Sequence, residues 1–282
     1  MKKYSFVFLV SLLVGCQNFG QLQLITDLPS TLKEVSGITT VQDSDLLWMH
    51  NDSGNKAIVY GVSLKGKIKE EISIDLKNKD WEDITSDGKG NLYIADFGNN
   101  GNKRKNLLIY KFNVMEAQEN NEASAQKIKF HYPEQTKFPP KKKHRFFDAE
   151  SVLFFKNYLY IFTKSRVKNK FGKTRLYKIP AKAGNYIAEF IAEFNNCNDM
   201  ECWITSAAMS PDKKQVALLT HNEVLVFSDY KSDDFFAGKL TRFGLKHNSQ
   251  KEGISFKDNN TLYITDERSH GKGGKLYEFS LN

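Results

Sequence analysis

The 282-residue chain lacks the motifs of several common enzyme classes. It contains no G-x-S-x-G nucleophile elbow, no P-loop and no H-E-x-x-H metal motif, so nothing supports α/β-hydrolase, P-loop nucleotidase or zincin chemistry. A long amphipathic helical pattern is missing as well. The best segment, residues 114–126, is rich in Glu, Asn and Gln, and we interpret it as an excursion between strands. These absences favour a β-rich fold without a recognisable nucleophile.

Long apolar runs are scarce, and the one near the start of the chain is short. Lys2 and Lys3 precede an apolar run from Phe6 to Val14, which is too short to span a bilayer and has the flanks of a secretory signal. The segment Leu13–Cys16 closely resembles a bacterial lipobox. An ordinary signal peptide that happens to contain a cysteine is the alternative.

The lipobox resemblance implies cleavage before Cys16, which would then carry a diacylglycerol and an N-acyl chain such as palmitate. We therefore expect a signal peptide at residues 1–15, a lipidated tether at 16–20 and a folded domain at 21–282. Removing residues 1–15 lowers the formal net charge from +8 to +6. Gln17 follows the cysteine where an Asp would retain the protein in the inner membrane of enteric bacteria. The expected location is thus the bacterial cell envelope, at the outer membrane.

The other two cysteines are Cys197 and Cys202. A C-x4-C pair is compatible with a metal knuckle, but the chain offers no second pair and no nearby His-x-x-x-His. In an exported protein the simpler prediction is a disulfide that closes a short loop.

A short phrase recurs five times, and an apolar run follows each copy about ten residues later. The copies are Ser36-Gly37-Ile38, Glu82-Asp83-Ile84, Glu150-Ser151-Val152, Ala207-Ala208-Met209 and Glu252-Gly253-Ile254. The steps between them are 46, 68, 57 and 45 residues, against roughly 40 to 50 for a four-stranded propeller blade. The repeat predicts an all-β fold, a single β-propeller of five blades, two of which carry insertions. A sixth, degenerate blade and a β-sandwich are the alternatives.

The last unit has only three strand-like runs, whereas residues 21–27 form one strand-like run before the first copy. We expect this N-terminal strand to complete the last blade, because closing the ring removes exposed sheet edges. We expect a monomer.

In a propeller, the connectors between blades share one face with the loops that join second and third strands, and here both are polar. Glu82, Glu150 and Glu252 open three innermost strands, and Asp80 and Asp148 precede two of them. Hard cations such as calcium take six to eight oxygen ligands. We predict a calcium site whose ligands come from Glu82, Glu150, Glu252, Asn51, Asp96 and Asp266. The alternative is that these side chains cap backbone amides or pair with Lys and Arg.

Basic residues gather on the same face around the third unit. Lys164–Arg175 holds six cations and no acid, and Lys141–Arg145 enters the same unit. Such a one-signed rim attracts anions: phosphates, acidic glycans, lipid head groups or an acidic protein. The predicted binding residues are His50, Asp52, Lys164, Arg166, Arg175, Arg145, His221 and Arg268. A solubilising loop is the alternative, and nucleic acid is not expected, because no aromatic stacking set interleaves the lysines.

The phrases HNDSGN, DWEDI, LYIADFGNN, DAES, EGIS and LYITDE resemble a group of exported bacterial β-propellers related to the NHL, TolB-like and SdiA-regulated propellers. The resemblance covers nearly all of the mature chain. Related lactonases and gluconolactonases hold calcium in a central channel through Glu, Asn and Asp, which implies the same six ligands here. Ser36 and Ala207 replace the acid in two units, and Thr163 and Thr220 replace the Asn or Asp. Relatives usually have six blades.

Two functions are compatible with these observations. The first is a membrane-tethered binding module that captures an anionic ligand on the polar face. The second is a calcium-dependent hydrolase of a lactone or phosphoester, in which the cation polarises a substrate oxygen. His50, His221 and His270 lie on the polar loops, and one of them could serve as its general base, although loop histidines are often only solvated. We favour the binding module, because the chain has a basic rim and no nucleophile motif and because two units lack the acid; the hydrolase is the alternative.

Overall fold

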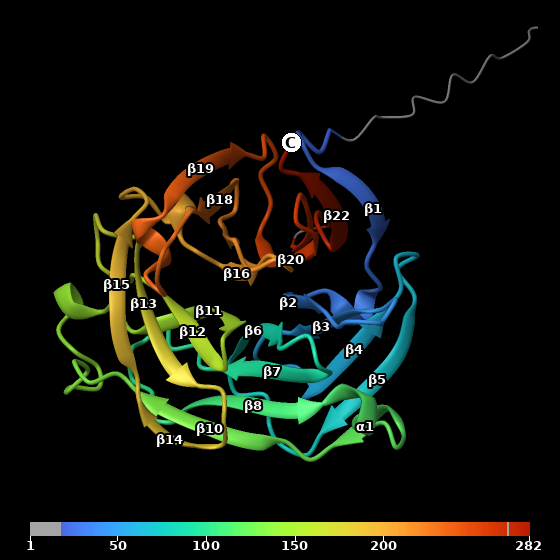
Figure 1. Ribbon diagram of the computed structural model, residues 1–282, viewed down its shortest axis with the longest axis horizontal. Helices are drawn as coiled ribbons and strands as arrows, with labels where there is room; N and C mark the ends of the chain where they lie inside the picture. The colour runs from blue at the N-terminus through green and yellow to red at the C-terminus, as the bar shows by residue number, and fades with distance from the viewer. Residues whose placement is uncertain (1–17, 270) are drawn as a thin grey trace, which may run out of the picture.

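Five β-sheets surround a common axis in the computed structural model, which describes residues 18–269 and 271–282 (Figure 1). The chain is almost entirely β, and the five sheets are the blades of a propeller, as the repeat predicts. The expected signal peptide, the lipidated Cys16 and His270 lie outside the described residues.

The first two blades each have five strands. From the axis outward, the first contains β2 (Val35–Thr40), β3 (Leu47–Asn51), β4 (Ile58–Val62), β5 (Ile68–Ile74) and β9 (Glu122–Ala123). The second contains β6 (Trp81–Ser86), β7 (Asn91–Asp96), β8 (Leu107–Asn113), β10 (Gln126–His131) and β14 (Gly184–Ile187).

The other three blades have four strands. The third contains β11 (Asp148–Phe155), β12 (Tyr158–Lys164), β13 (Lys173–Pro180) and β15 (Glu189–Asn195). The fourth contains β16 (Ser206–Met209), β17 (Gln215–Leu219), β18 (Glu223–Ser228) and β19 (Lys239–Gly244). The fifth contains β20 (Lys251–Asp258), β21 (Thr261–Asp266), β22 (Lys275–Ser280) and β1 (Gln23–Asp27).

The ring is closed by the two ends of the chain. Strand β1 pairs antiparallel with β22, from Gln23 opposite Glu278 to Asp27 opposite Lys275. The two strands lie side by side in Figure 1. This confirms the predicted N-terminal closing strand.

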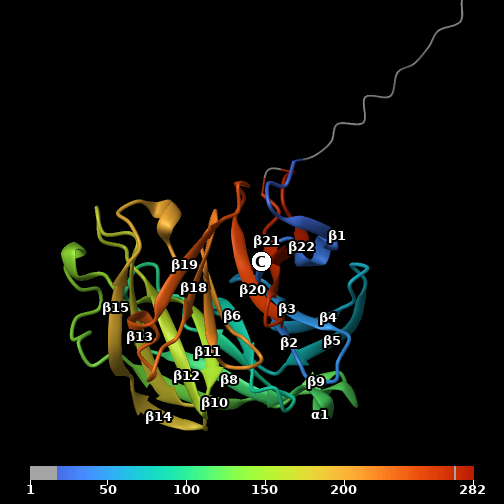
Figure 2. The same ribbon diagram turned by 45° about the horizontal axis from the view of Figure 1, so that its top comes forward.

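The two long steps of the repeat are insertions within blades. The segment after β8 begins with α1 (Val114–Gln118), which Asn113 caps by accepting hydrogen bonds from the N–H groups of Met115 and Glu116. It continues into β9, which pairs in parallel with β5 of the first blade (Figure 2). Strand β14 of the second insertion likewise pairs in parallel with β10. Both insertions therefore bind a neighbouring blade.

In residues 18–269 and 271–282, helical structure is otherwise confined to single turns. Short 3-10 turns occur at η1 (Ser30–Leu32), η2 (Lys142–His144), η3 (Met200–Cys202) and η4 (Phe235–Ala237). Within the described residues, no helix has the length and apolar character needed to cross a membrane.

The hydrophobic core is divided among the gaps between blades. Five apolar clusters fill the five gaps; the one between the first and second blades contains Trp48 and Trp81, whose side chains are fully buried. Truncating such an aromatic to alanine costs about 3–5 kcal/mol, so these gaps are a major source of stability.

The recurring phrase forms a β-bulge at the start of the innermost strand. The pairing register shifts at Ser36, Glu82, Glu150 and Glu252, each of which is the extra residue opposite its partner strand. In the fourth blade, Ser206 pairs with Leu219, and its neighbour Thr205 therefore takes this place. The alignment of Ala207 with the other copies is thus wrong by two residues.

Candidate functional site

Carboxyl groups gather where the innermost strands begin. Bulged residues of three innermost strands contribute Glu82, Glu150 and Glu252, and the residues after β3 and β21 contribute Asp52 and Glu267. We call these the axial acidic cluster: Asp52, Asp80, Glu82, Asp148, Glu150, Glu252 and Glu267. Lys164 and Arg166 pair with Glu150 and Asp148, and Arg104 lies 3.9 Å from Asp80, so three cations offset part of these seven charges. The cluster therefore has an excess of negative charge when its acids are ionised.

Three members of the cluster lie close enough to share one ion. Ligand oxygens of Asp52, Asp80 and Glu82 all lie within 4.8 Å of one another. Glu82 is only 8% exposed, and no hydrogen bond or ion pair to its carboxylate occurs among the described residues. Buried carboxylates ordinarily have a partner, so Glu82 is the exception that points to a cation.

A glycine makes this approach possible. A Cβ atom on Gly98 would lie 2.0 Å from Oε1 of Glu82 and 2.6 Å from Cγ of Asp80. The backbone of Gly98 also donates a hydrogen bond of 3.1 Å to the Asp80 carbonyl. Any larger residue at position 98 would displace the two carboxylates.

The protonation of these acids reflects their crowding. Burial, and then the charges of Glu150 and Asp52, raise the pKa of Glu82 well above its usual range. Burial is also the main cause that raises the pKa of Asp52 to about 6. The pKa of Asp80 is raised by burial even though the Arg104 guanidinium opposes the shift. A bound cation would reverse these shifts, because it stabilises the ionised forms.

The acids of the third blade have partners. Nζ of Lys164 lies 2.9 Å from Glu150, and Nε of Arg166 lies 2.5 Å from Asp148. Burial opposes the charged form of Lys164, but the carboxylates of Glu150 and Glu252 outweigh it and raise its pKa. Burial and the neighbouring Glu150 raise the pKa of Asp148 to about 7. These two cations are therefore ion-paired, and they are not free to hold an anion on their own.

The fifth blade contributes two more acids. Oε1 of Glu252 lies 3.6 Å from Nε2 of His221. Burial, followed by the charges of Glu252 and Asp52, raises the pKa of Glu267 to about 8. The predicted loop residue His221 thus lies at the axial acidic cluster.

A disulfide loop supports the cationic side of the cluster. Cys197 and Cys202 form the predicted disulfide, directly before Trp203. The indole N–H of Trp203 donates to the Ser165 carbonyl at 2.8 Å, and its ring lies under both cations, 4.9 Å from Nζ of Lys164 and 4.7 Å from Cζ of Arg166. Such cation–π contacts hold the two side chains in place. Sequence reasoning did not single out Trp203.

Three predicted metal ligands are engaged elsewhere. The Asn51 amide donates to the Thr31 carbonyl, Asp96 accepts from Arg104 at 2.7 Å, and Asp266 accepts from the Tyr277 hydroxyl at 2.9 Å. Asp52 and Glu267, which follow Asn51 and Asp266, lie in the axial acidic cluster, because successive side chains of a strand point to opposite sides. Phe97, which follows Asp96, is instead buried in the core between the second and third blades.

The predicted anion-binding residues separate into different environments. His50 is fully buried, and burial lowers its pKa to about 4, so it is a neutral core residue and not a surface ligand or a base. Arg145 and Arg268 donate to the carbonyls of Pro140 and Leu28. Arg175 is the one that lines a pocket.

One buried acid, Asp83, forms hydrogen bonds between blades, a role that the sequence did not indicate. Asp83 accepts hydrogen bonds from the N–H groups of Ile84 and Val152 and from the Ser206 hydroxyl. Burial raises its pKa and these bonds oppose the shift. Its place inside the recurring phrase was visible in the sequence, but its partners come from three blades.

No protein-family model matches the chain, and no curated protein matches it in sequence. Among solved structures, the nidogen/laminin complex is 12% identical with a TM-score of 0.46, and the match covers 83% of this chain and 72% of that chain. Virginiamycin B lyase from Staphylococcus aureus is 14% identical with a TM-score of 0.43, covering 90% and 69%. The Cps50 (Swd1) β-propeller domain of Myceliophteria thermophila is 11% identical with a TM-score of 0.48, covering 93% and 100%. None of these similarities carries a functional argument, and the propeller assignment rests on the sheet order described above.

Proposed function

We propose that the protein is a lipid-anchored, extracytoplasmic propeller that binds a divalent cation, calcium by its oxygen donors, in the axial acidic cluster and presents it to an anionic ligand. The observation that carries the proposal is the convergence of Asp52, Asp80 and Glu82 within 4.8 Å around a buried, unpartnered Glu82. Three carboxylates and no nitrogen or sulfur donor suit a hard cation, whose remaining positions are left for water or ligand oxygens.

The charge balance of the cluster supports the same function. Among the described residues, Asp52, Glu82 and Glu267 have no Lys or Arg partner, whereas Arg104 lies 3.9 Å from Asp80, and Lys164 and Arg166 pair with Glu150 and Asp148. A cation among Asp52, Asp80 and Glu82 would therefore leave the cluster nearer to neutrality. An anionic ligand would then bind through the cation itself, because Lys164 and Arg166 are already ion-paired with Glu150 and Asp148.

Calorimetric titration of the folded domain with calcium chloride tests the cation site. We expect binding of about one ion per chain, and a loss of at least about tenfold in affinity for Glu82→Gln and Asp52→Asn, since each removes a charged ligand. Without metal, Glu82→Gln should melt no lower than the parent protein, because it replaces a carboxyl group whose ionised form is disfavoured by burial and by neighbouring acids.

Glu71→Gln serves as the matched control, because Glu71 is exposed on β5, away from the cluster. Absence of both binding heat and a calcium-induced thermal shift in the parent protein would refute the cation site. An equal loss of affinity in Glu71→Gln would show that the effect is general electrostatics.

A second candidate function is a calcium-dependent hydrolase of a lactone or phosphoester. The observation that favours it is the pair of His221 and Glu252, 3.6 Å apart, at the same cluster. A carboxylate beside an imidazole orients it for proton transfer, and a bound cation polarises a substrate oxygen. Hydrolysis that requires calcium and is lost in His221→Ala, but not in the exposed His131→Ala, would support this function.

We also propose that the protein is anchored at the bacterial outer membrane. The lipobox-like segment Leu13–Cys16 and the following Gln17 support this location. The resemblance to exported bacterial propellers supports the same assignment. Labelling with radioactive palmitate should mark the parent protein in a bacterial host and should fail for Cys16→Ser. Labelling that persists in Cys16→Ser would contradict a lipid anchor at this cysteine.

A further inference from the structure

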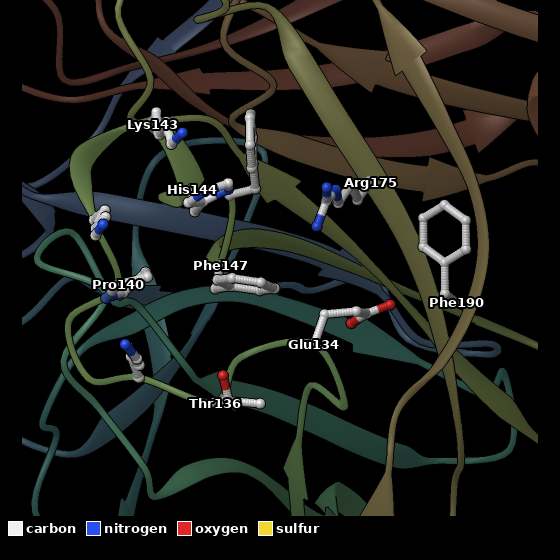
Figure 3. A pocket seen from close by; sticks show the side chains of 11 residues that line it. Glu134, Thr136, Pro140, Lys143, His144, Phe147, Arg175 and Phe190 are labelled. Carbon is white, nitrogen blue, oxygen red and sulfur yellow. The ribbon is translucent and has the colours of Figure 1, made fainter.

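A second site lies on the outer part of the third blade, formed by residues that the axial acidic cluster does not use. It is a pocket of about 620 Å³ between the connector 132–147 and strands β13 and β15 (Figure 3). This volume is within the range of small-molecule sites, about 300–1,000 Å³.

The charge of the pocket is strongly one-sided. Lys137, Lys141, Lys143, His144 and Arg175 line it. In the part of the chain that the structure describes, the three lysines have no carboxylate within ion-pair distance. The single acid of the lining, Glu134, accepts a hydrogen bond from the Tyr177 hydroxyl at 3.3 Å. The pocket therefore attracts an anion.

Apolar and aromatic surface forms the rest of the lining. Phe146, Phe147 and Phe190 contribute rings, and Phe190 is 43% exposed. The Arg175 guanidinium lies 4.7 Å from the ring centre of Phe146 and 5.7 Å from that of Phe147. In Figure 3, Arg175, Phe147 and Glu134 face one another across the pocket. A guanidinium stacked on rings presents its donors and a flat face together, which suits a planar anion.

Buried side chains hold the connector 132–147, which carries the lysines, in place. Nε2 of the buried Gln135 donates to the Asn102 carbonyl at 3.0 Å, and Oδ1 of Asn102 accepts from the Phe147 N–H at 3.0 Å. Asn102 in turn donates to the Asn99 carbonyl at 3.1 Å. Buried networks of this kind hold a loop in one conformation, so a ligand would meet a formed pocket.

We propose that this pocket binds a small organic anion, a phosphate or carboxylate joined to a flat apolar body. The lysines and Arg175 contact the anionic group, and Phe190 and Phe146 contact the apolar body. The site is separate from the proposed cation site, since no residue of the axial acidic cluster lines it. The proposed export would expose the pocket to soluble metabolites of the cell envelope.

Fluorescence titration with 1-naphthyl phosphate tests the proposal, with inorganic phosphate and 1-naphthylmethylamine as comparison probes. We expect 1-naphthyl phosphate to bind at least about tenfold more tightly than either probe, because only it satisfies both halves of the pocket. Arg175→Gln and the double variant Lys141→Gln/Lys143→Gln should each weaken it about tenfold, and Phe190→Ser should weaken it without changing the response to inorganic phosphate.

The matched control is the double variant Lys168→Gln/Lys170→Gln, which removes the same charge from exposed positions outside the pocket. Unchanged affinity in this control supports the proposal. Equal loss in the control, or binding of inorganic phosphate as tightly as the aryl phosphate, overturns it. Binding to phosphatidic acid vesicles without binding of 1-naphthyl phosphate also overturns it in favour of a membrane contact.

Arg175 lines the pocket, and its Nε also lies 3.6 Å from a carboxylate oxygen of Glu193. Because Arg175→Gln could therefore destabilise the fold, the melting temperature of each variant is measured to separate a folding defect from a binding defect. The lysine double variant alters only exposed side chains and provides the decisive measurement. Calcium affinity should be unchanged in every pocket variant. A pocket that fails this test while calcium still binds would leave the proposed cation site intact.

Discussion

Asp83 of the second blade accepts a hydrogen bond of 3.2 Å from the hydroxyl of Ser206 in the fourth blade, 123 residues later in the chain. Ser206 in turn accepts from the Ile254 N–H of the fifth blade at 3.2 Å. Asp83 also accepts from the Val152 N–H of the third blade, so these two side chains join four innermost strands around the axis. The bonds are buried, so water does not compete for them.

Replacing Ser206 should weaken the whole ring. We expect Ser206→Ala to lower the free energy of unfolding by about 1–3 kcal/mol, because it leaves the Ile254 N–H and one Asp83 oxygen without this partner. Urea unfolding measures the change. Ser73→Ala, at an exposed position of β5, should stay within about 0.5 kcal/mol of the parent protein. Equal effects of the two substitutions would refute a special role for Ser206.

Stability without metal should fall as the pH rises from 6.5 to 7.5. The pKa of Asp148 is raised to about 7 and that of Glu267 to about 8, so the folded state keeps protons that the unfolded state has released. Their contribution is complete below about pH 4 and is lost as the pH passes through these values. His50, whose pKa is lowered to about 4, acts in the opposite sense only below about 6.5.

Melting temperatures across this window, with and without calcium, give the measurement. We expect calcium to raise the melting temperature more at pH 7.5 than at 5.5, because it favours ionised carboxylates. Burial lowers the pKa of Lys251 to about 8, so this group raises stability with pH only above pH 7.5. A melting temperature that rises between pH 6.5 and 7.5 without metal would contradict the assignment.

Gly98 should be required for calcium binding. We expect Gly98→Ala to reduce calcium affinity at least about tenfold, because the added Cβ would occupy the place of the Glu82 and Asp80 carboxyl groups. Gly244→Ala is the matched control, since a Cβ there meets no atom within 4 Å. Calorimetry that finds the two variants equally competent would argue against the site.

The disulfide should contribute to stability and to the order of Trp203. Replacing Cys197 and Cys202 by serine should cost about 2 kcal/mol, the value expected for so short a closed loop. Indole fluorescence of Trp203 reports the second effect, provided that Trp48 and Trp81 are treated as a constant buried background. Identical urea midpoints with and without reductant would contradict a stabilising bond.

The blade count and the closing strand were predictable, because they depend on local strand and turn chemistry repeated along the chain. The side of the strand on which each acid lies could not be predicted from the sequence. Asn51 ends β3 and its amide donates to the Thr31 carbonyl, whereas Asp52, one residue later, lies in the axial acidic cluster, and the sequence does not show at which residue the side chains change sides. In the fourth blade, Thr205 holds the place of the acid, and only the pairing of Ser206 with Leu219 reveals it.

The sequence also could not predict which Lys or Arg pairs with which acid. The run Lys164–Arg175 contains six cations, yet Lys164 and Arg166 turn toward Glu150 and Asp148 while Arg175 lines the outer pocket. Which cation meets which acid depends on contacts between residues of different strands and loops. Phe190 enters the pocket from β15, 15 residues after Arg175 and on another strand of the same blade.

The pairing of β1 with β22 has a mechanical consequence. Strand β1 is the outermost strand of its blade and the first strand of the chain, so a pull on the residues ahead of it reaches the ring through the β1–β22 hydrogen bonds. The ion pair of Lys275 with Asp27 and the buried Leu28 oppose its release. Under load, the propeller should therefore open first at this seam, while the bonds between the innermost strands lie farthest from the point of force.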